Sequence, residues 1–171
     1  MANQIPERLI NFNVYNGTNV MLGVADVELP EVQKMTDTLS GAGIGGEVDS
    51  SVLGHFQSME STINFRVVTK AAAELLSSRS RQITLRGVQQ VHDASTGETL
   101  VQRIRVTINV QNKAFALGTF APASNTDSSG TYEVTYLALY IDDQEVLVID
   151  KFNMVFKVNG VDELLAVRRG I

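Results

Sequence analysis

The chain contains no cysteine and no tryptophan among its 171 residues. Without thiols it can form neither a disulfide framework nor a thiolate zinc site, so cysteine usage indicates nothing about redox compartment. The two histidines, His55 and His92, lie in separate segments, without an H-E-x-x-H sequence or a serine elbow beside them. This spacing predicts neither a metal centre nor a catalytic triad. We therefore expect no cofactor, no metal and no enzymatic activity.

Long apolar runs are also missing, so no segment predicts a membrane span. The first residues lack a basic stretch followed by an apolar one, and we expect no Sec-type signal. The net charge of −5 argues against a protein that grips nucleic acid by neutralising phosphates. Hydrophobic residues make up 44% of the chain. This composition is that of a globular protein, and we expect a single domain spanning residues 1–171.

Short segments that alternate apolar and polar residues dominate the sequence and predict strands with one buried face. The clearest is Ile104–Val110, in which every second residue is aliphatic. Near the start, the segment Leu9–Tyr15 alternates in the same way and precedes Asn16-Gly17, a strong signal for a hairpin turn. The sequence therefore predicts a mainly β fold.

Helical signals are few. The segment Lys70–Leu76 consists of strong helix formers behind Thr69, a suitable N-cap residue. We expect it to cover a sheet. At the C-terminus, a predicted strand over 145–158 leads to an Asn-Gly turn and a short helix, which Asp162 could cap.

Residues 31–58 form an excursion that is polar, rich in glycine and weakly periodic. Within it, residues 41–46 read G-x-G-x-x-G. A dinucleotide site needs these glycines between a buried strand and a helix, and neither is predicted here. We therefore interpret these glycines as a flexible loop tip.

Two charged groups suggest other chemistry. Asp142-Asp143 resembles a pair of catalytic carboxylates, but neighbouring residues point apart, and we expect a solvated turn. Four arginines could form a basic face that contacts nucleic acid or an acidic partner: Arg81, Arg86, Arg103 and Arg105. Because aromatic residues for base stacking are absent from 103–109, we favour a polar sheet face with ion pairs between subunits.

The last segment, Ile149–Arg169, has a distinctive order of residues: I-D-x-x-N-M-x-x-K-V-N-G-V-D-x-L-x-x-x-R-R. It resembles the C-terminal signature of the major tail tube proteins of contractile-tailed phages and phage-tail-like bacteriocins. The residues that carry it are Asp150, Asn153, Asn159, Gly160, Val161, Asp162 and Arg168. The opening hairpin and the glycine-rich excursion leading to Glu47-Val48-Asp49 agree with the same family, and the similarity extends along essentially the whole chain.

This resemblance implies an antiparallel β-sandwich or partial barrel with one internal helix and a short C-terminal helix. It also implies that six copies form a ring, whose strands close a continuous inner β-barrel. Rings would stack into a hollow tube in the virion tail, assembled in the cytoplasm of the host bacterium. The implied partners are sister copies, the contractile sheath, the tape-measure protein, and the baseplate and tail terminator proteins. DNA would only pass through the bore, and no membrane is involved.

On this interpretation the excursion is a hairpin with Leu29–Thr38 and Val48–Thr69 as its two strands, and its tip, Ser40–Gly46, reaches the adjoining ring. The residues expected at subunit or ring contacts are Val32, Met35, Gly41, Gly43, Ile44, Gly46, Val48 and Phe56. A neutral or acidic bore would let DNA slide without sticking. That hypothesis is wrong if the four arginines line the bore.

Two other functions fit parts of the sequence. A tube subunit of the type VI secretion kind would share the hexameric ring, and polymerisation together with neighbouring sheath and tape-measure genes would separate the two. A monomeric ligand-binding β-barrel would need an apolar pocket and would remain single at high concentration.

Overall fold

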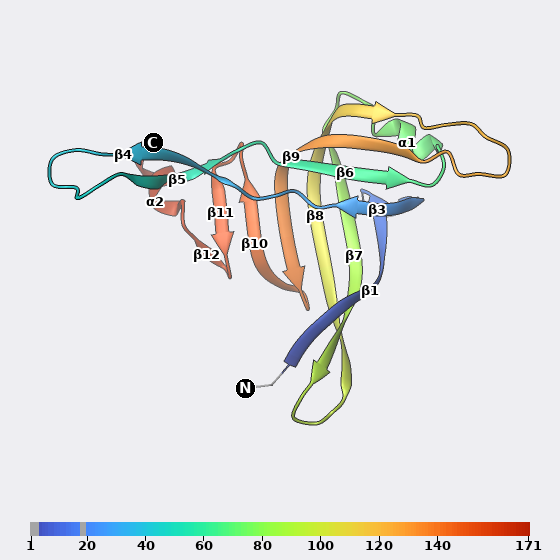
Figure 1. The fold of residues 1–171 in the computed structure, drawn as a ribbon, viewed down its shortest axis with the longest axis horizontal. Helices are drawn as coiled ribbons and strands as arrows, with labels where there is room; N and C mark the ends of the chain where they lie inside the picture. Colours follow the sequence, from blue (N-terminus) through green and yellow to red (C-terminus); the bar gives the residue numbers. More distant parts are fainter. Residues whose placement is uncertain (1–3, 18–19) are drawn as a thin grey trace.

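The computed structural model describes residues 4–17 and 20–171, which form an antiparallel β fold with two short helices (Figure 1). Residues 1–3, and residues 18 and 19 after the predicted Asn16-Gly17 turn, lie outside the described residues. The strands are β1 (Gln4–Asn16), β2 (Val20–Leu22), β3 (Val24–Glu28), β4 (Lys34–Leu39), β5 (Val48–Phe56), β6 (Glu60–Phe65), β7 (Arg81–Asp93), β8 (Thr99–Ala116), β9 (Ser128–Ile141), β10 (Gln144–Asp150), β11 (Val155–Val158) and β12 (Val161–Asp162). The helices are α1 (Lys70–Glu74) and α2 (Leu165–Gly170).

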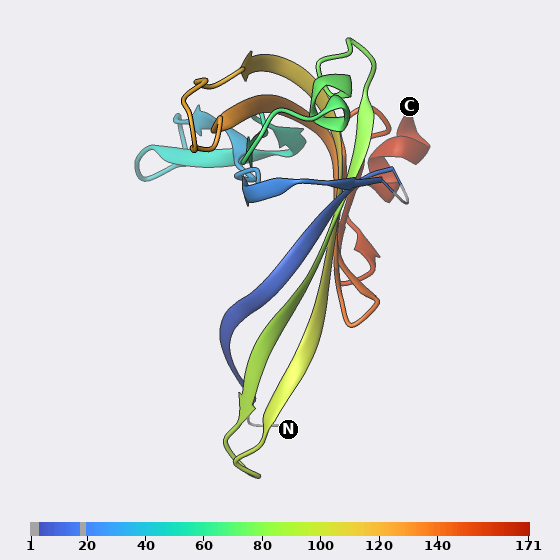
Figure 2. The ribbon, with the colours of Figure 1, turned by 90° about the vertical axis from the view of Figure 1, so that its right-hand side faces the viewer.

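Ten of the strands form one sheet in the order β12-β11-β10-β9-β8-β7-β1-β2, with β6 and β3 branching from β9. The branch arises because the first half of β9 pairs with β6, while its second half pairs with β10. The path through the sheet leads from β2 through β1, β7, β8, β9 and β6 to β3. Because only Gly23 separates β2 from β3 in the chain, the two ends of this path lie close together, and the sheet curls back on itself (Figure 2). The predicted partial barrel is confirmed.

The core lies inside this curl. Ile63, Ile83, Ile108 and Tyr132 come from four different strands and are completely buried. Alternation along each strand directs these side chains to one side of the sheet, as the sequence predicts.

The helix α1 packs against the core with its buried Ala72. Its N-cap is Thr69, whose hydroxyl accepts a hydrogen bond from the Ala72 N–H at 3.1 Å, as predicted. Among the residues described, no helix is long and apolar enough to span a membrane.

The C-terminal segment differs from the prediction in two places. The strand expected over 145–158 is interrupted between β10 and β11, because the Asp150 carboxylate accepts hydrogen bonds from the N–H groups of Phe152 and Asn153 and turns the chain. The expected Asn159-Gly160 turn joins β11 to β12. The second difference is at α2, whose N-cap is Leu164 rather than Asp162.

Candidate assembly surfaces

The hairpin of β4 and β5, residues 34–56, forms a separate two-stranded sheet that we call the arm. It extends to one end of the molecule, on the left in Figure 1. Cross-strand pairing from Leu39 opposite Val48 to Thr36 opposite Ser51 confirms the predicted hairpin. The second predicted strand is wrong beyond Phe56, because the chain leaves the arm at residues 57–59 and continues as β6 in the other sheet.

One face of the arm carries three exposed apolar side chains. Met35, Leu39 and Val48 share this face with Asp37 and Ser50, because cross-strand partners and alternate residues point to the same side of a hairpin. Their exposed fractions are 47%, 49% and 54%. On the other face, Thr38 donates a hydrogen bond to Asp49 at 2.8 Å. A lone two-stranded hairpin is marginally stable in water, so this amphipathic arm is suited to packing against another chain.

The other residues expected at contacts also lie in or beside the arm. Val32 precedes it and Ile44 is in its tip, and both side chains are exposed. The tip glycines Gly41, Gly43 and Gly46 have open space around them, which agrees with a loop tip between antiparallel strands. Phe56 is different: its ring packs edge-on against Phe156 of its own chain, with the centroids 5.1 Å apart.

A second apolar surface lies away from the arm, in the angle between β3 and the long strands β1, β7 and β8. It is a groove of about 290 Å³ whose wall is mainly aliphatic and aromatic. The apolar lining residues are Leu9, Phe12, Val27, Leu29, Leu85, Ile104 and Val106. Half of the Leu9 and Leu29 side chains is exposed, so the groove is open to a partner.

Two of the outer strands of the large sheet, β1 and β12, are poorly suited to simple strand addition. Strand β2 pairs only with residues 14–16 of β1, which leaves the earlier part of β1 paired on one side among the described residues. That part contains Pro6 and two bulges, at Glu7 and Ile10. At the other end, β12 has only two residues. Proline, bulges and short edge strands are the features that keep sheets from pairing indiscriminately.

The basic face predicted from four arginines is only partly correct. Arg86 lies directly opposite Arg105 on neighbouring strands, and Arg103 shares their face. Arg81 has the opposite orientation along β7 and does not belong to this group. Because like charges directly opposite each other are destabilising, this face needs counter-charge.

Counter-charge and stacking come from the same chain. Asp143, in the predicted turn between β9 and β10, lies 3.9 Å from both Arg103 and Arg105. The Arg105 guanidinium lies 4.4 Å from the centre of the Tyr140 ring, and Arg86 stacks similarly on Tyr15. These contacts hold the guanidinium groups over the sheet, around a polar groove of about 540 Å³.

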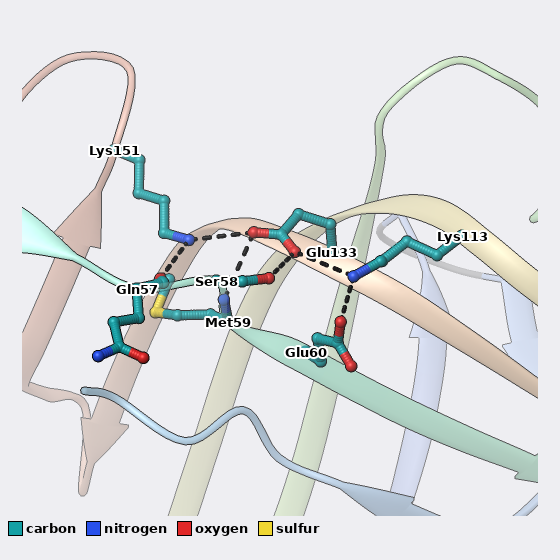
Figure 3. Close-up of polar contacts among 7 residues, drawn as sticks. All are labelled: Gln57, Ser58, Met59, Glu60, Lys113, Glu133 and Lys151. Carbon is teal, nitrogen blue, oxygen red and sulfur yellow. Dashed lines mark hydrogen bonds and ion pairs between the residues drawn. The ribbon is translucent and has the colours of Figure 1, made fainter.

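A polar cluster fixes the junction between the arm and the barrel (Figure 3). Glu133 of β9 accepts a hydrogen bond from the Ser58 hydroxyl at 2.5 Å and lies 3.1 Å from the Lys151 ammonium. Lys113 pairs with Glu60 and approaches Glu133 at 3.9 Å. Burial raises the pKa of Glu133, but the hydrogen bonds from Ser58 and Lys151 outweigh it, so the net pKa is lowered.

The C-terminal signature forms a second fixed structure. The Arg168 guanidinium contacts the Asp162 carboxylate at 2.5 Å and the Met154 carbonyl oxygen at 2.8 Å. The hydrogen bond from Arg168 lowers the pKa of Asp162. This arrangement places the buried Leu164 against Gly54 of the arm, so the signature connects the end of the chain to the arm.

A family model for phage tail tube protein FII matches residues 6–171. The chain belongs to this family. It is also similar to the tail tube protein of Escherichia phage P2, with 28% identity over 170 residues that cover 98% of each chain. The resemblance found in the C-terminal signature is thereby confirmed, and the family is one of structural proteins of the virion tail rather than of enzymes.

Two solved structures share the fold. One is a chain of the PVC sheath/tube terminator of an extracellular contractile injection system, with a TM-score of 0.56 and 14% identity over 80% of this chain and 97% of that one. The other is a chain of the PVC sheath-tube complex, with a TM-score of 0.53 and 16% identity over 75% of this chain and 87% of that one. At these identities, the two likenesses show a shared fold.

Sequence reasoning missed the polar cluster around Glu133. Its partners Ser58 and Lys151 are separated from it by 75 and 18 residues, and no local pattern marks them. It also missed the approach of Leu164 to Gly54, although a glycine inside an otherwise strand-like segment is a signal for close backbone contact.

Proposed function

We propose that residues 1–171 act as one domain that forms hexameric rings, and that these rings stack into the hollow tube of a contractile tail. The observation that carries this proposal is the arm, which exposes Met35, Leu39 and Val48 on one face in a chain that belongs to a tail tube family. The arm lies at one end of the subunit (Figure 1), whereas the residues that line the apolar groove belong mainly to β1, β3, β7 and β8. A contact between two different surfaces on successive copies is head-to-tail, and such contacts generate rings or stacks.

Within this assembly, we assign the contacts between copies to Val32, Met35, Ile44 and Val48, with Gly41, Gly43 and Gly46 allowing the tip to adapt. Phe56 contributes by holding the base of the arm. The further partners are a contractile sheath, a tape-measure protein, and baseplate and terminator proteins, with DNA passing through the bore. The fold shared with a sheath-tube complex and a sheath/tube terminator supports the sheath and the terminator as partners.

Negative-stain electron microscopy of the purified protein tests this proposal. The expected result is rings and hollow tubes with six-fold symmetry. In a variant that carries Met35→Ser and Val48→Ser, tubes should be lost while the far-UV circular dichroism of the β fold is retained. A Val101→Ser variant is the control, because Val101 is also exposed, at 62%, but lies on β8 outside the arm. Featureless monomers at every concentration would contradict the proposal.

A genome-free particle is the second candidate, because the structural likeness includes an extracellular contractile injection system. Particles that protect DNA from nuclease indicate a phage tail, whereas particles without DNA indicate an injection device. The hypothesis of a neutral or acidic bore depends on whether Arg86, Arg103 and Arg105 face the bore. A tube reconstruction with these arginines facing the bore would refute it.

A further inference from the structure

The arm contacts the rest of its own subunit near its base. Phe56 packs against Phe156, and the Lys34 ammonium lies 5.2 Å from the centre of the same Phe156 ring. Leu164 packs against Gly54 so closely that a Cβ at position 54 would lie 2.6 Å from it. These contacts support one side of the arm, close to α2.

A second support acts on the connection that joins the arm to β6. Lys151 donates a hydrogen bond to the Gln57 carbonyl oxygen at 2.9 Å and contacts Glu133 at 3.1 Å. The Lys151 contact is with Oε1 of Glu133, and the Met59 backbone nitrogen lies 3.4 Å from the same oxygen. Oε2 of Glu133 accepts a hydrogen bond from the Ser58 hydroxyl. Figure 3 shows both carboxylate oxygens directed at this connection. We call Glu133 and Lys151 the latch.

The latch acts at the position where the arm could swing. Residues 57–59 belong to no strand, and they connect two separate sheets. A small rotation there would displace the whole arm. The side chains of Lys151 and Glu133 are only 21% and 25% exposed, so their charged hydrogen bonds are stronger than those of a fully solvated pair.

We propose that Glu133 and Lys151 are positioning residues that fix the direction of the arm. Without them the arm folds but points in a range of directions. The consequence for stacking rests on the proposed function, since it requires that the arm contacts another copy. The direction of the arm can be measured in the single subunit, independently of assembly.

The absence of cysteine allows two spin labels to be placed without background labelling. Ser51→Cys labels the arm and Gln82→Cys labels β7, and both positions are exposed. Pulsed electron paramagnetic resonance then gives the distribution of distances between them. We expect one narrow distribution in the labelled parent and a broader one after Glu133→Gln or Lys151→Met.

The matched controls are Glu145→Gln and Lys157→Met. They remove an ion pair of 3.7 Å in the same sheet, on strands β10 and β11, and should leave the distribution narrow. Ser58→Ala removes only the hydroxyl that donates to Glu133 of the latch, and it covers the case in which the charge variants do not fold. Unchanged width in Ser58→Ala and in every folded latch variant would overturn the proposal.

Electron microscopy of the same variants separates the two proposals. Broader distributions together with loss of tubes support both of them. Broader distributions with normal tubes support the latch and contradict the role of the arm in stacking. Unchanged distributions contradict the latch, whatever the tubes show.

Discussion

Replacing Gly54 by alanine tests whether the C-terminal signature supports the arm. Gly54 has a φ of +76°, and an added Cβ would lie 2.6 Å from the Leu164 Cδ2 atom. The left-handed backbone costs an alanine about 1–2 kcal/mol. Leu164 is 1% exposed and has little room to move, so the overlap costs about 1–3 kcal/mol more. We expect Gly54→Ala to lower the free energy of unfolding by about 2–5 kcal/mol.

A double-mutant cycle separates the two causes. Leu164→Ala removes the Cγ and Cδ atoms that the new Cβ would meet, and by itself destabilises the protein by about 2–5 kcal/mol. In that background Gly54→Ala should cost only the backbone strain, about 1–2 kcal/mol. The expected coupling energy between the two positions is therefore about 1–3 kcal/mol.

The measurement is urea unfolding of the four proteins in the cycle, followed by circular dichroism. Gly97→Ala is the matched control, because Gly97 has a φ of +73° and no atom within 4 Å of its added Cβ. It should show the backbone strain without the overlap. Additivity of Gly54→Ala and Leu164→Ala within about 0.5 kcal/mol would refute the contact between the arm and the C-terminal segment.

Two further changes probe buried and paired groups. The Tyr132 hydroxyl is buried without a hydrogen-bond partner among the described residues, and burial raises its pKa to about 12. Tyr132→Phe should therefore stabilise the fold to urea by about 1 kcal/mol, and a clear loss of stability would reveal a bound partner such as water. The pKa of Asp162 is lowered by Arg168, so its ionised form stabilises the native state above the ordinary value of 3.8, and this contribution is lost as the pH falls through the lower native pKa. The stability of Asp162→Asn measured at decreasing pH should lack this loss, and an acid dependence equal to that of the parent would contradict the assignment.

Local patterns predicted much of the fold. The alternation of Ile104–Val110 forms the middle of β8, Thr69 caps α1, and Asn159-Gly160 turns the chain between β11 and β12. In each case the cause lies within a few neighbouring residues. The hairpin of the arm, by contrast, was implied by the family resemblance, because residues 31–58 are only weakly periodic.

What the sequence did not predict depends on contacts between distant residues. The Asp150 carboxylate interrupts the predicted strand by accepting hydrogen bonds from backbone N–H groups, and the alternation of apolar and polar residues gives no sign of these bonds. The Asp162 carboxylate accepts hydrogen bonds from Arg168 and from the Leu164 N–H, and α2 begins only at Leu165, so the helix cap expected from residue type alone does not form. Arg81 does not belong to the basic face, because it lies an odd number of positions from Arg86 along β7 and the two side chains therefore point to opposite sides of the sheet. The contact surfaces were predicted from the family resemblance, and only an assembled tube can test them residue by residue.

The blunted edge strands β1 and β12 of the large sheet have a consequence for the kinetics of growth. If two copies met along these edges, Pro6 and the bulges of β1 on one side and the two-residue β12 on the other would leave few backbone hydrogen bonds between them. In the proposed tube, we therefore expect an isolated pair to dissociate more readily than a copy held by several neighbours at a tube end. Elongation would then be fast and spontaneous initiation rare, so a supplied first ring would determine where a tail begins.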